Sequence, residues 1–282
     1  MKPRDPYIEL IGKILTVVEA LRDGDEALTL QDLTVRTGLV KSSIYRILQS
    51  LKRHAYVEQD GAGGPYRLGL RFLALARGFA GGMQLIRLAR PYLRELRDRF
   101  DETTYLAIPQ GDQCVFVDLQ ETHRELGLIG PLGADVHYHA TAAGKAMAAF
   151  LPAAVRDALL QELPLIRLTR RTLAQRKQVQ QEWAKVRRLG YAVNDEETIV
   201  GAVFLAAPFF GADSTVCGSI TIGMPKARFS GHVRKLVATH LIDACQRFSK
   251  ALSALGYESP RWNPVAHFSR EDSQGRLQAV HG

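Results

Sequence analysis

Hydrophobic residues recur every three to four positions through the first part of the chain, which is the spacing of amphipathic helices. This spacing predicts a helix over about residues 7–21 and a shorter one over residues 30–37. Thr29, followed three residues later by Asp32, resembles a capping box at the start of the second helix. Gly38 follows that helix, and its missing Cβ allows the left-handed turn that leads into a third helix. Helix, glycine turn and helix in this order predict a helix-turn-helix motif.

The third helix, which begins near Val40, has two chemically different faces. Its hydrophobic stripe consists of Ile44, Ile47, Leu48 and Leu51. Its polar stripe consists of Ser42, Arg46, Gln49 and Arg53. Between Leu33 and Val57 the sequence has five Lys or Arg residues and no acidic residue. Such a helix packs on a small core with one face and offers hydrogen-bond donors to a DNA groove with the other, so we expect it to bind DNA.

A short hairpin is predicted directly after this helix. Residues 56–57 favour a strand, residues 61–65 contain three glycines and a proline that favour a loop, and residues 66–68 favour a return strand. We interpret the hairpin as a wing, with Arg67 beside its tip in position to contact phosphates.

The next segment is predicted to join two domains. Residues 70–79 are hydrophobic at helical spacing and are followed by Gly81 and Gly82, which predict an interruption of the helix. Another helix, with leucines on one side and arginines on the other, is predicted over about residues 84–100. The expected organisation is a DNA-binding domain over residues 1–69, a linker helix over 70–82, a second domain over 83–256 and a poorly ordered tail over 257–282.

From residue 104 onwards the pattern changes to strands mixed with helices. Residues 105–120 predict a hairpin that turns around residues 110–112, and the alternation over 124–140 predicts further strand structure. Three helices are expected over 139–151, 152–163 and 173–191, followed by paired strands over 202–210 and 215–224 and a closing helix over about 231–255. Strands and helices mixed in this way predict an antiparallel α+β sensor domain.

Composition narrows the class of protein. The chain has 282 residues, 46% of them hydrophobic and 23% charged, which is a globular composition long enough for about two domains. Its formal charge of +8 suits a polyanionic partner, and residues 61–100 are the most basic segment, with eight arginines and two acidic residues. The three cysteines are far apart, so neither a disulfide framework nor a paired-cysteine metal site is expected. With no secretory signal and no apolar run of membrane-spanning length, we expect a cytoplasmic protein with reduced thiols and no membrane contact.

The side chains expected to reach DNA lie on the third helix and the wing. Base-edge readout needs hydrogen-bonding side chains on the first turns of the inserted helix, and five residues satisfy that requirement: Lys41, Ser42, Ser43, Tyr45 and Arg46. Arg46 is the best candidate for a bidentate contact to guanine, with Gln49 further along the same face. Lys41, Lys52 and Arg53 are interpreted as phosphate contacts. The alternative interpretation is an ordinary solvated basic helix.

A second candidate site lies at the start of the helix predicted after residue 140. Thr141 is expected to cap that helix and to leave the amides of Ala142, Ala143 and Gly144 facing outward. Free amides at a helix start bind anions, and the small side chains let a carboxylate approach the backbone. The alternative is a plain capped helix whose small residues serve tight packing.

Three separated motifs resemble those of one protein family. GLVKSSIYRILQSLKRHAYVEQ with the later YRLG resembles the winged helix-turn-helix of IclR-type transcriptional regulators, and HATAAGKAMAAFL and LGYAVNDEETIVGAVFLAAPFF resemble two signatures of their effector domain. The resemblance covers about residues 7–255 and implies a GAF-like effector domain, an antiparallel sheet flanked by helices. It also implies a ligand-responsive regulator of catabolic genes that binds a double-stranded DNA operator as a dimer or a dimer of dimers, with no cofactor and no enzymatic activity.

The resemblance further implies where a small carboxylate effector binds. Family positions align here with residues 141–144 and with Asn194, Phe204, Thr221 and Gly223. Relatives that bind very small acids often carry Asp, Cys and Ser at such positions, whereas Asn, Phe and Gly in this chain leave a less polar pocket with an aromatic wall. This departure favours an aromatic or larger carboxylate, unless Phe204 is simply part of the core.

Other chemistries find less support in the sequence. His137 and His139 would share one face of a strand, but no third metal ligand is evident nearby. Gly144 and Lys145 do not form a phosphate loop, because His139 stands at the position of the first glycine and Ala146 replaces the Ser or Thr. An RNA-binding role would need stacking aromatics on a sheet face, which the N-terminal region lacks. The remaining alternative is a non-regulatory small-molecule-binding protein or enzyme on the same fold, with the winged helix as a docking module.

Overall fold

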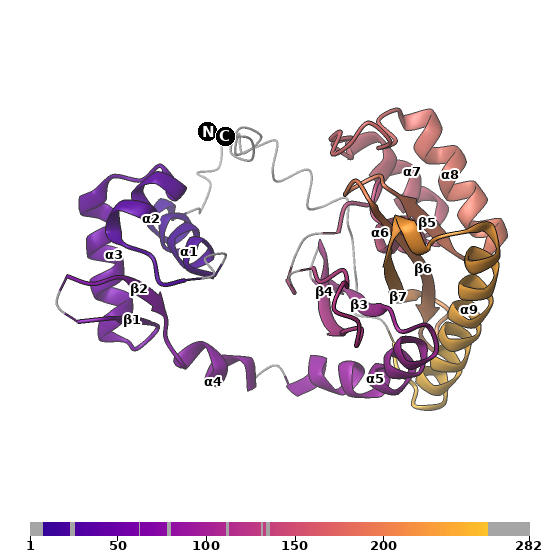
Figure 1. Ribbon diagram of the computed structural model, residues 1–282, viewed down its shortest axis with the longest axis horizontal. Coiled ribbons are helices and arrows are strands. Elements are labelled where there is room, and N and C mark those ends of the chain that lie inside the picture. The colour runs from indigo at the N-terminus through magenta and orange to yellow at the C-terminus, as the bar shows by residue number, and fades with distance from the viewer. Residues whose placement is uncertain are drawn as a thin grey trace, which may run out of the picture. The chain divides into compact units, whose positions relative to one another are not determined.

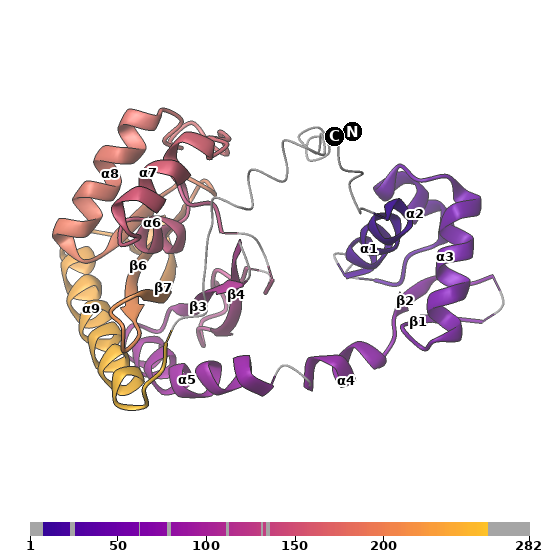
Figure 2. The same cartoon turned by 180° about the vertical axis from the view of Figure 1, so that it is seen from behind.

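The chain divides into two compact units, Met1–Met83 and Gln84–Gly282 (Figures 1 and 2). The computed structural model describes residues 8–22, 26–61, 63–77, 80–110, 113–130, 132–133 and 136–258. The domain boundary expected between residues 82 and 83 lies one residue from this division. The expected tail over 257–282 falls outside the described residues from residue 259 onwards.

The N-terminal unit combines helices with a two-stranded wing (Figure 1). Its elements are α1 (Glu9–Arg22), α2 (Leu30–Thr37), α3 (Lys41–Arg53), β1 (Val57–Gln59), β2 (Tyr66–Leu68) and α4 (Arg71–Arg77). The predicted capping box of α2 is formed, since the Asp32 amide donates to Thr29 Oγ1 at 3.2 Å and the Thr29 amide donates to Asp32 Oδ2 at 2.9 Å. Gly38 ends α2 with a φ of 66°, in the left-handed conformation. The predicted helix-turn-helix and its wing are therefore confirmed.

One hydrophobic cluster holds the N-terminal unit together. Ile44 and Leu48 of α3 are completely buried in it. Val17 of α1, Leu33 of α2 and Tyr66 of β2 belong to the same cluster. Full burial of a large aliphatic side chain contributes about 1.5–3 kcal/mol, so these contacts fix the orientation of α3. The polar face of α3 is left in solvent as a consequence.

The connection between the units differs from the prediction. After α4 ends at Arg77, α5 spans Ala80–Phe100. Gly81 and Gly82 lie inside α5, so the prediction that they interrupt the helix is wrong, and Pro91 also lies within it. A glycine costs a helix only about 1 kcal/mol, and the hydrophobic face of α5, which packs into the core of the second unit, offsets that cost.

A five-stranded antiparallel sheet, in the order β4-β3-β7-β6-β5, forms the centre of the second unit. The strands are β3 (Thr103–Gln110), β4 (Gln113–Gln120), β5 (Ala192–Asp195), β6 (Ala202–Phe210) and β7 (Val216–Pro225). The predicted pairings of β3 with β4 and of β6 with β7 are confirmed. In the register of the sheet, Tyr105 faces Thr221 across β3 and β7, and Phe204 faces Gly223 across β6 and β7.

Helices cover both faces of this sheet (Figures 1 and 2). One face packs on α5 and α9 (Gly231–Ala254). The other face packs on α6 (Ala142–Ala148), α7 (Ala153–Glu162) and α8 (Arg176–Leu189). A short 3-10 helix, η1 (Lys226–Arg228), follows β7. Alternate residues of β6 serve the two cores: Val203 and Leu205 pack on the α9 side, and Phe204 and Ala206 on the α6 side. The predicted α+β class is confirmed.

Two details of the second unit were predicted incorrectly. Residues 124–130 and 136–140 contain no strand; they form loops and turns, and the Val136 amide donates one hydrogen bond to the Cys114 carbonyl of β4 at 3.1 Å. The glycines of this segment favour turns over pairing. β5 was not predicted at all, because four residues are too few to show a strand pattern.

Within the described ranges, no helix is long and apolar enough to cross a membrane.

Candidate nucleic-acid interface and ligand cavity

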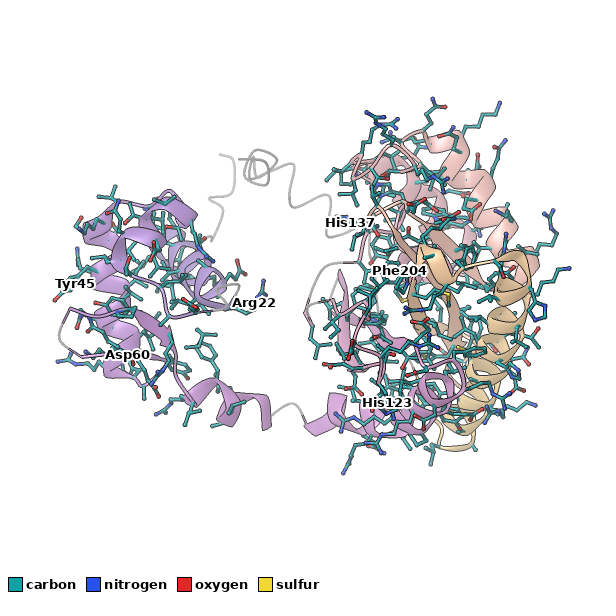
Figure 3. The ribbon with its side chains drawn as sticks, in the orientation of Figure 1. Arg22, Tyr45, Asp60, His123, His137 and Phe204 are labelled. Atoms are coloured by element: carbon teal, nitrogen blue, oxygen red, sulfur yellow. The ribbon has the colours of Figure 1, made fainter. Side chains whose placement is uncertain are left out.

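The first two turns of α3 present a polar surface to solvent. Lys41, Ser42 and Arg46 are exposed, and Ser43 is half-buried. Tyr45 is 50% exposed and projects away from the core of the unit (Figure 3). α3 contains no acidic side chain, so nothing on this helix repels a phosphate backbone. The major groove of DNA is wide enough for an α-helix, and these side chains supply the donors and acceptors that read base edges.

The second half of α3 is different, because two of its predicted DNA contacts are engaged with the wing. Lys52 Nζ donates to Gln59 Oε1 at 2.8 Å, and Gln49 is half-buried with its side chain beside the hydroxyl of Tyr66. Arg53 is exposed at the end of the helix. A single exposed hydrogen bond contributes only about 1 kcal/mol, so Lys52 exchanges its partner for a phosphate at small cost.

Arg67 of the wing lies between two acids that the sequence reasoning did not take into account. Its guanidinium is 3.0 Å from Glu58, which is opposite in register, and 3.2 Å from Asp60. These carboxylates reduce the positive potential of the wing. Because an exposed ion pair contributes about 0–1 kcal/mol, a phosphate still competes for Arg67.

In the second unit a cavity of about 460 Å³ lies against the sheet and the start of α6. Its walls are mainly apolar, and its volume is typical of sites for small organic ligands. The lining residues are Tyr105, Phe116, Gly127, Leu128, Ile129, Gly130, His137, Thr141, Ala142, Ala143, Leu168, Asn194, Thr198, Ile199, Phe204 and Thr221. His137 and Phe204, which are far apart in the sequence, lie near each other on this side of the unit (Figure 3).

The structure brings most of the predicted effector-binding residues together at this cavity. Those that line it are Thr141, Ala142, Ala143, Asn194, Phe204 and Thr221. Gly144 lies outside the lining, because its amide donates to Thr141 Oγ1 at 3.0 Å and its Cα packs on the backbone of His137 and Tyr138. Its amide is therefore not available to a ligand, contrary to the prediction.

Gly223 is also outside the lining, but it shapes the cavity through Phe204. A Cβ at Gly223 would lie 2.7 Å from Phe204 Cε1, so the ring occupies the space that the glycine leaves. The Tyr105 ring is 6.4 Å from the Phe204 ring and 5.7 Å from the Phe116 ring, centroid to centroid. Tyr105, Phe116 and Phe204 thus form an aromatic floor.

Polar groups are few but well defined. Thr221 is 2% exposed, and its hydroxyl has no hydrogen-bond partner among the described residues. The amides of Ala142 and Ala143 likewise have no acceptor within the part of the chain that the structure describes. The Tyr105 hydroxyl donates to the Leu128 carbonyl, and burial raises the pKa of Tyr105 to about 12. The cavity therefore offers neutral donors next to an aromatic surface.

The sequence reasoning missed the lining residues from β3, β4, the loop over 127–130 and the loop that follows β5. These segments are separated by up to a hundred residues in the chain. No spacing rule connects them, because the order of the strands in the sheet, rather than the chain, places them side by side.

His139 and the three cysteines lie in the interior of the second unit. His139 is completely buried, its Nε2 is 2.9 Å from the Ile166 carbonyl, and burial lowers the pKa of its imidazole. It lies in a turn, not on the predicted strand. The described residues contain no cluster of three His, Cys, Asp or Glu side chains that could hold a metal ion. All three cysteines are buried, and burial raises the pKa of the Cys114 thiol to about 12.

An exposed recognition helix with a wing, in one chain with an α+β unit that encloses a small-molecule cavity, defines a ligand-responsive DNA-binding transcriptional regulator. The family described as "Bacterial transcriptional regulator IclR C-terminal" matches residues 78–250, and the IclR helix-turn-helix domain matches residues 11–61. The chain therefore belongs to the IclR family of transcriptional regulators, which are not enzymes.

Relatives match along nearly the whole chain. The HTH-type transcriptional regulator XynR of Escherichia coli K12 is 28% identical over 253 residues, which cover 89% of this chain and 99% of that protein. The HTH-type transcriptional regulator TtgV of Pseudomonas putida is 30% identical over 256 residues, with 90% and 95% covered. A solved IclR homologue from Microbacterium hydrocarbonoxydans, complexed with 4-hydroxybenzoate, covers 86% of this chain and 99% of its own with a TM-score of 0.70. At 20% identity, that likeness shows the fold alone.

Proposed function

We propose that this regulator senses a small organic carboxylate that carries an aromatic ring, and that it controls catabolic genes in response. The observation that supports the proposal is the pairing of the aromatic floor with the free amides of Ala142 and Ala143 in one cavity. Aromatic rings pack favourably on one another, and backbone amides bind carboxylates. α6 has only seven residues, so its dipole has no part in the proposed site. The groups proposed to bind the carboxylate are the individual amides and the Thr221 hydroxyl.

On the DNA side, we propose that Ser42, Ser43, Tyr45 and Arg46 read base edges from α3, whereas Lys41 at its start contacts a phosphate. Lys52, Arg53 and Arg67 would contact phosphates, with Gln49 at the border of the two sets. This assignment follows from exposure along α3 and from the general division between base contacts and backbone contacts.

We also propose that the protein binds its double-stranded operator as a homo-oligomer, a dimer or a dimer of dimers. Ile8, Ile11 and Leu15 lie at i, i+3 and i+7 along one side of α1 and its start, and are 59%, 51% and 53% exposed. A second copy would remove this apolar stripe from water. Two recognition helices would then read half-sites about 34–36 Å apart or a multiple of that distance.

A gel-shift experiment on the DNA upstream of its own gene tests the proposed function. We expect a specific band whose affinity falls steeply with salt, with a slope of about −0.9 per phosphate contact. Benzoate or 4-hydroxybenzoate should change that band and raise the melting temperature, whereas benzyl alcohol, a matched ring without the carboxylate, should do neither. If benzyl alcohol and benzoate have equal effects, recognition does not depend on the carboxylate. If only pyruvate has an effect, the ligand does not need an aromatic ring.

Gly223→Ala is expected to weaken binding of ring-bearing acids about tenfold. The new Cβ would lie within 2.8 Å of two Phe204 ring atoms, so the ring must move toward the cavity and shorten it. The added variant Gly223→Ala with Phe204→Leu should recover most of the affinity, because the smaller side chain gives way. Isothermal titration of benzoate into the three proteins measures the effect. Unchanged affinity in Gly223→Ala would show that Phe204 does not limit the cavity.

A further inference from the structure

A fully buried lysine lies directly behind the cavity. Lys145 of α6 is 0% exposed, and its Nζ is 2.5 Å from Glu197 Oε1 and also donates to the Val193 carbonyl. Glu182 of α8 is further away, at 3.8 Å, and has Lys185 as a closer partner at 2.9 Å. Charged side chains are almost never fully buried without a partner. The pairing of Lys145 with Glu197 is therefore a specific feature of this interior.

Glu197 belongs to the loop over residues 194–199, which begins with the last two residues of β5 and forms one wall of the cavity. Its amide donates to Asn194 Oδ1 at 2.8 Å, and Asn194 Nδ2 donates to Thr198 Oγ1 at 2.7 Å. Asn194 and Thr198 both line the cavity, one on each side of Glu197 in the chain. On the other side of the loop, Thr172 Oγ1 donates to the Glu197 carbonyl at 2.6 Å. Lys145 thus contacts this segment twice, at Glu197 in the loop and at Val193 in the adjoining strand β5.

The same lysine belongs to α6, whose first residues form another wall of the cavity. Ala142 and Ala143, which line the cavity, precede Lys145 by only three and two residues in α6. One ion pair therefore joins the start of α6 to the loop that contains Asn194 and Thr198. These two walls are more than fifty residues apart in the chain.

Stability alone does not account for this pair. Removing two charges from water costs several kcal/mol per ion, and apolar replacements of buried pairs are often neutral or stabilising. Burial also raises the pKa of the Glu197 carboxyl, against the opposing effect of Lys145, and Glu197 Oε2 has no partner among the described residues. A direct ion pair does have one advantage over apolar packing, because it fixes the distance between two specific atoms.

We propose that Lys145 and Glu197 are positioning residues that hold the loop over 194–199 at a fixed distance from the start of α6, so that both walls of the cavity are in place before a ligand binds. This inference rests on the proposed function in so far as the cavity is the effector site. The contribution to affinity is preorganisation, since a wall that is already ordered loses less conformational entropy on binding.

The test compares wild type with Lys145→Met and with the double variant Lys145→Met, Glu197→Met, all as the full chain. Three quantities are measured: the melting temperature, hydrogen exchange of the amides over 194–201 without ligand, and affinity for 4-hydroxybenzoate as the probe. Lys145→Met should lower the melting temperature, because Glu197 is left buried without its partner. It should also speed hydrogen exchange in the loop about tenfold and reduce the affinity for 4-hydroxybenzoate about tenfold. The double variant should regain most of the melting temperature but neither the loop protection nor the affinity.

Arg90→Met is the matched control, because Arg90 pairs with the buried Asp118 at 3.0 Å on the face of the sheet that packs on α5. It should lower the melting temperature without changing loop exchange or probe affinity. Recovery of all three quantities in the double variant would reduce the pair to a structural role and overturn the proposal. So would wild-type loop protection in Lys145→Met.

The two proposals fail in different ways. If wild type does not bind 4-hydroxybenzoate or any other acid, sensing of a carboxylate is refuted, while loop exchange still decides the role of the ion pair. If Lys145→Met does not fold, the double variant carries the comparison, because it leaves no unpaired charge from this pair. Native-like loop protection in that folded double variant would then overturn the positioning role.

Discussion

Arg46→Ala is expected to reduce sharply the preference of this regulator for its operator while retaining most of its affinity for unrelated DNA. Arg46 is exposed on the first half of α3, among side chains that include no acid, and it is anchored by the buried Ile44 and Leu48 on the other face. A bidentate arginine contact to guanine is worth about 1–3 kcal/mol of discrimination. Affinity for the operator should therefore fall roughly ten- to hundredfold, and affinity for a scrambled duplex much less. Footprinting and gel shifts on both duplexes measure the difference.

Arg53→Ala is the matched control, because it removes the same charge from the far end of the same helix. It should weaken binding to operator and scrambled DNA alike and reduce the salt slope by about one. If both variants lose specificity to the same degree, the division of α3 into a base-reading half and a phosphate-binding half is incorrect.

Gly144→Ala should destabilise the second unit by about 1–3 kcal/mol and so lower its melting temperature by several degrees. A Cβ at this position would lie 2.5 Å from the His137 carbonyl oxygen and 2.7 Å from Tyr138 Cα. Both are backbone atoms that cannot rotate away, so α6 must shift and carry Ala142 and Ala143 with it. We therefore expect a weaker response to carboxylates as well. Calorimetry and probe titration measure the two effects.

Gly231→Ala provides the comparison. Gly231 is the first residue of α9, and a Cβ there would meet no heavy atom within 4 Å. Alanine is the better helix former, so stability should stay the same or rise by up to about 1 kcal/mol. If Gly144→Ala melts at the wild-type temperature, close packing is not the reason for the glycine.

The DNA-binding half of the molecule was the more predictable one, because its signals are local. The capping box at Thr29, the left-handed turn at Gly38 and the hydrophobic stripe of α3 each depend on residues within one or two helical turns. What the local signals could not show is the engagement of side chains across elements. Lys52 hydrogen-bonds to Gln59 because the wing folds back beside α3. Arg67 pairs with Glu58 and Asp60 because the two strands of the wing lie side by side.

The second unit was predictable in class but not in detail. Its long strands and helices follow from hydrophobic periodicity, whereas Gly81 and Gly82 within α5 show that packing overrides a weak local preference. Gly144 is a second example of a local prediction that failed. The sequence predicts that its amide is free for a ligand, whereas in the structure this amide donates to Thr141 Oγ1.

From its sequence alone, this protein is determined to be an α+β regulator with a basic recognition helix and a candidate anion site after Thr141. Each of these features rests on neighbouring residues, whose geometry the backbone fixes locally. Only the tertiary structure decided that Phe204 lies over Gly223, that Tyr105 and Phe116 complete the aromatic floor, and that Lys145 meets Glu197. Those contacts join strands and loops distant in the chain, and they exist because burying apolar surface brings the separate elements into one core.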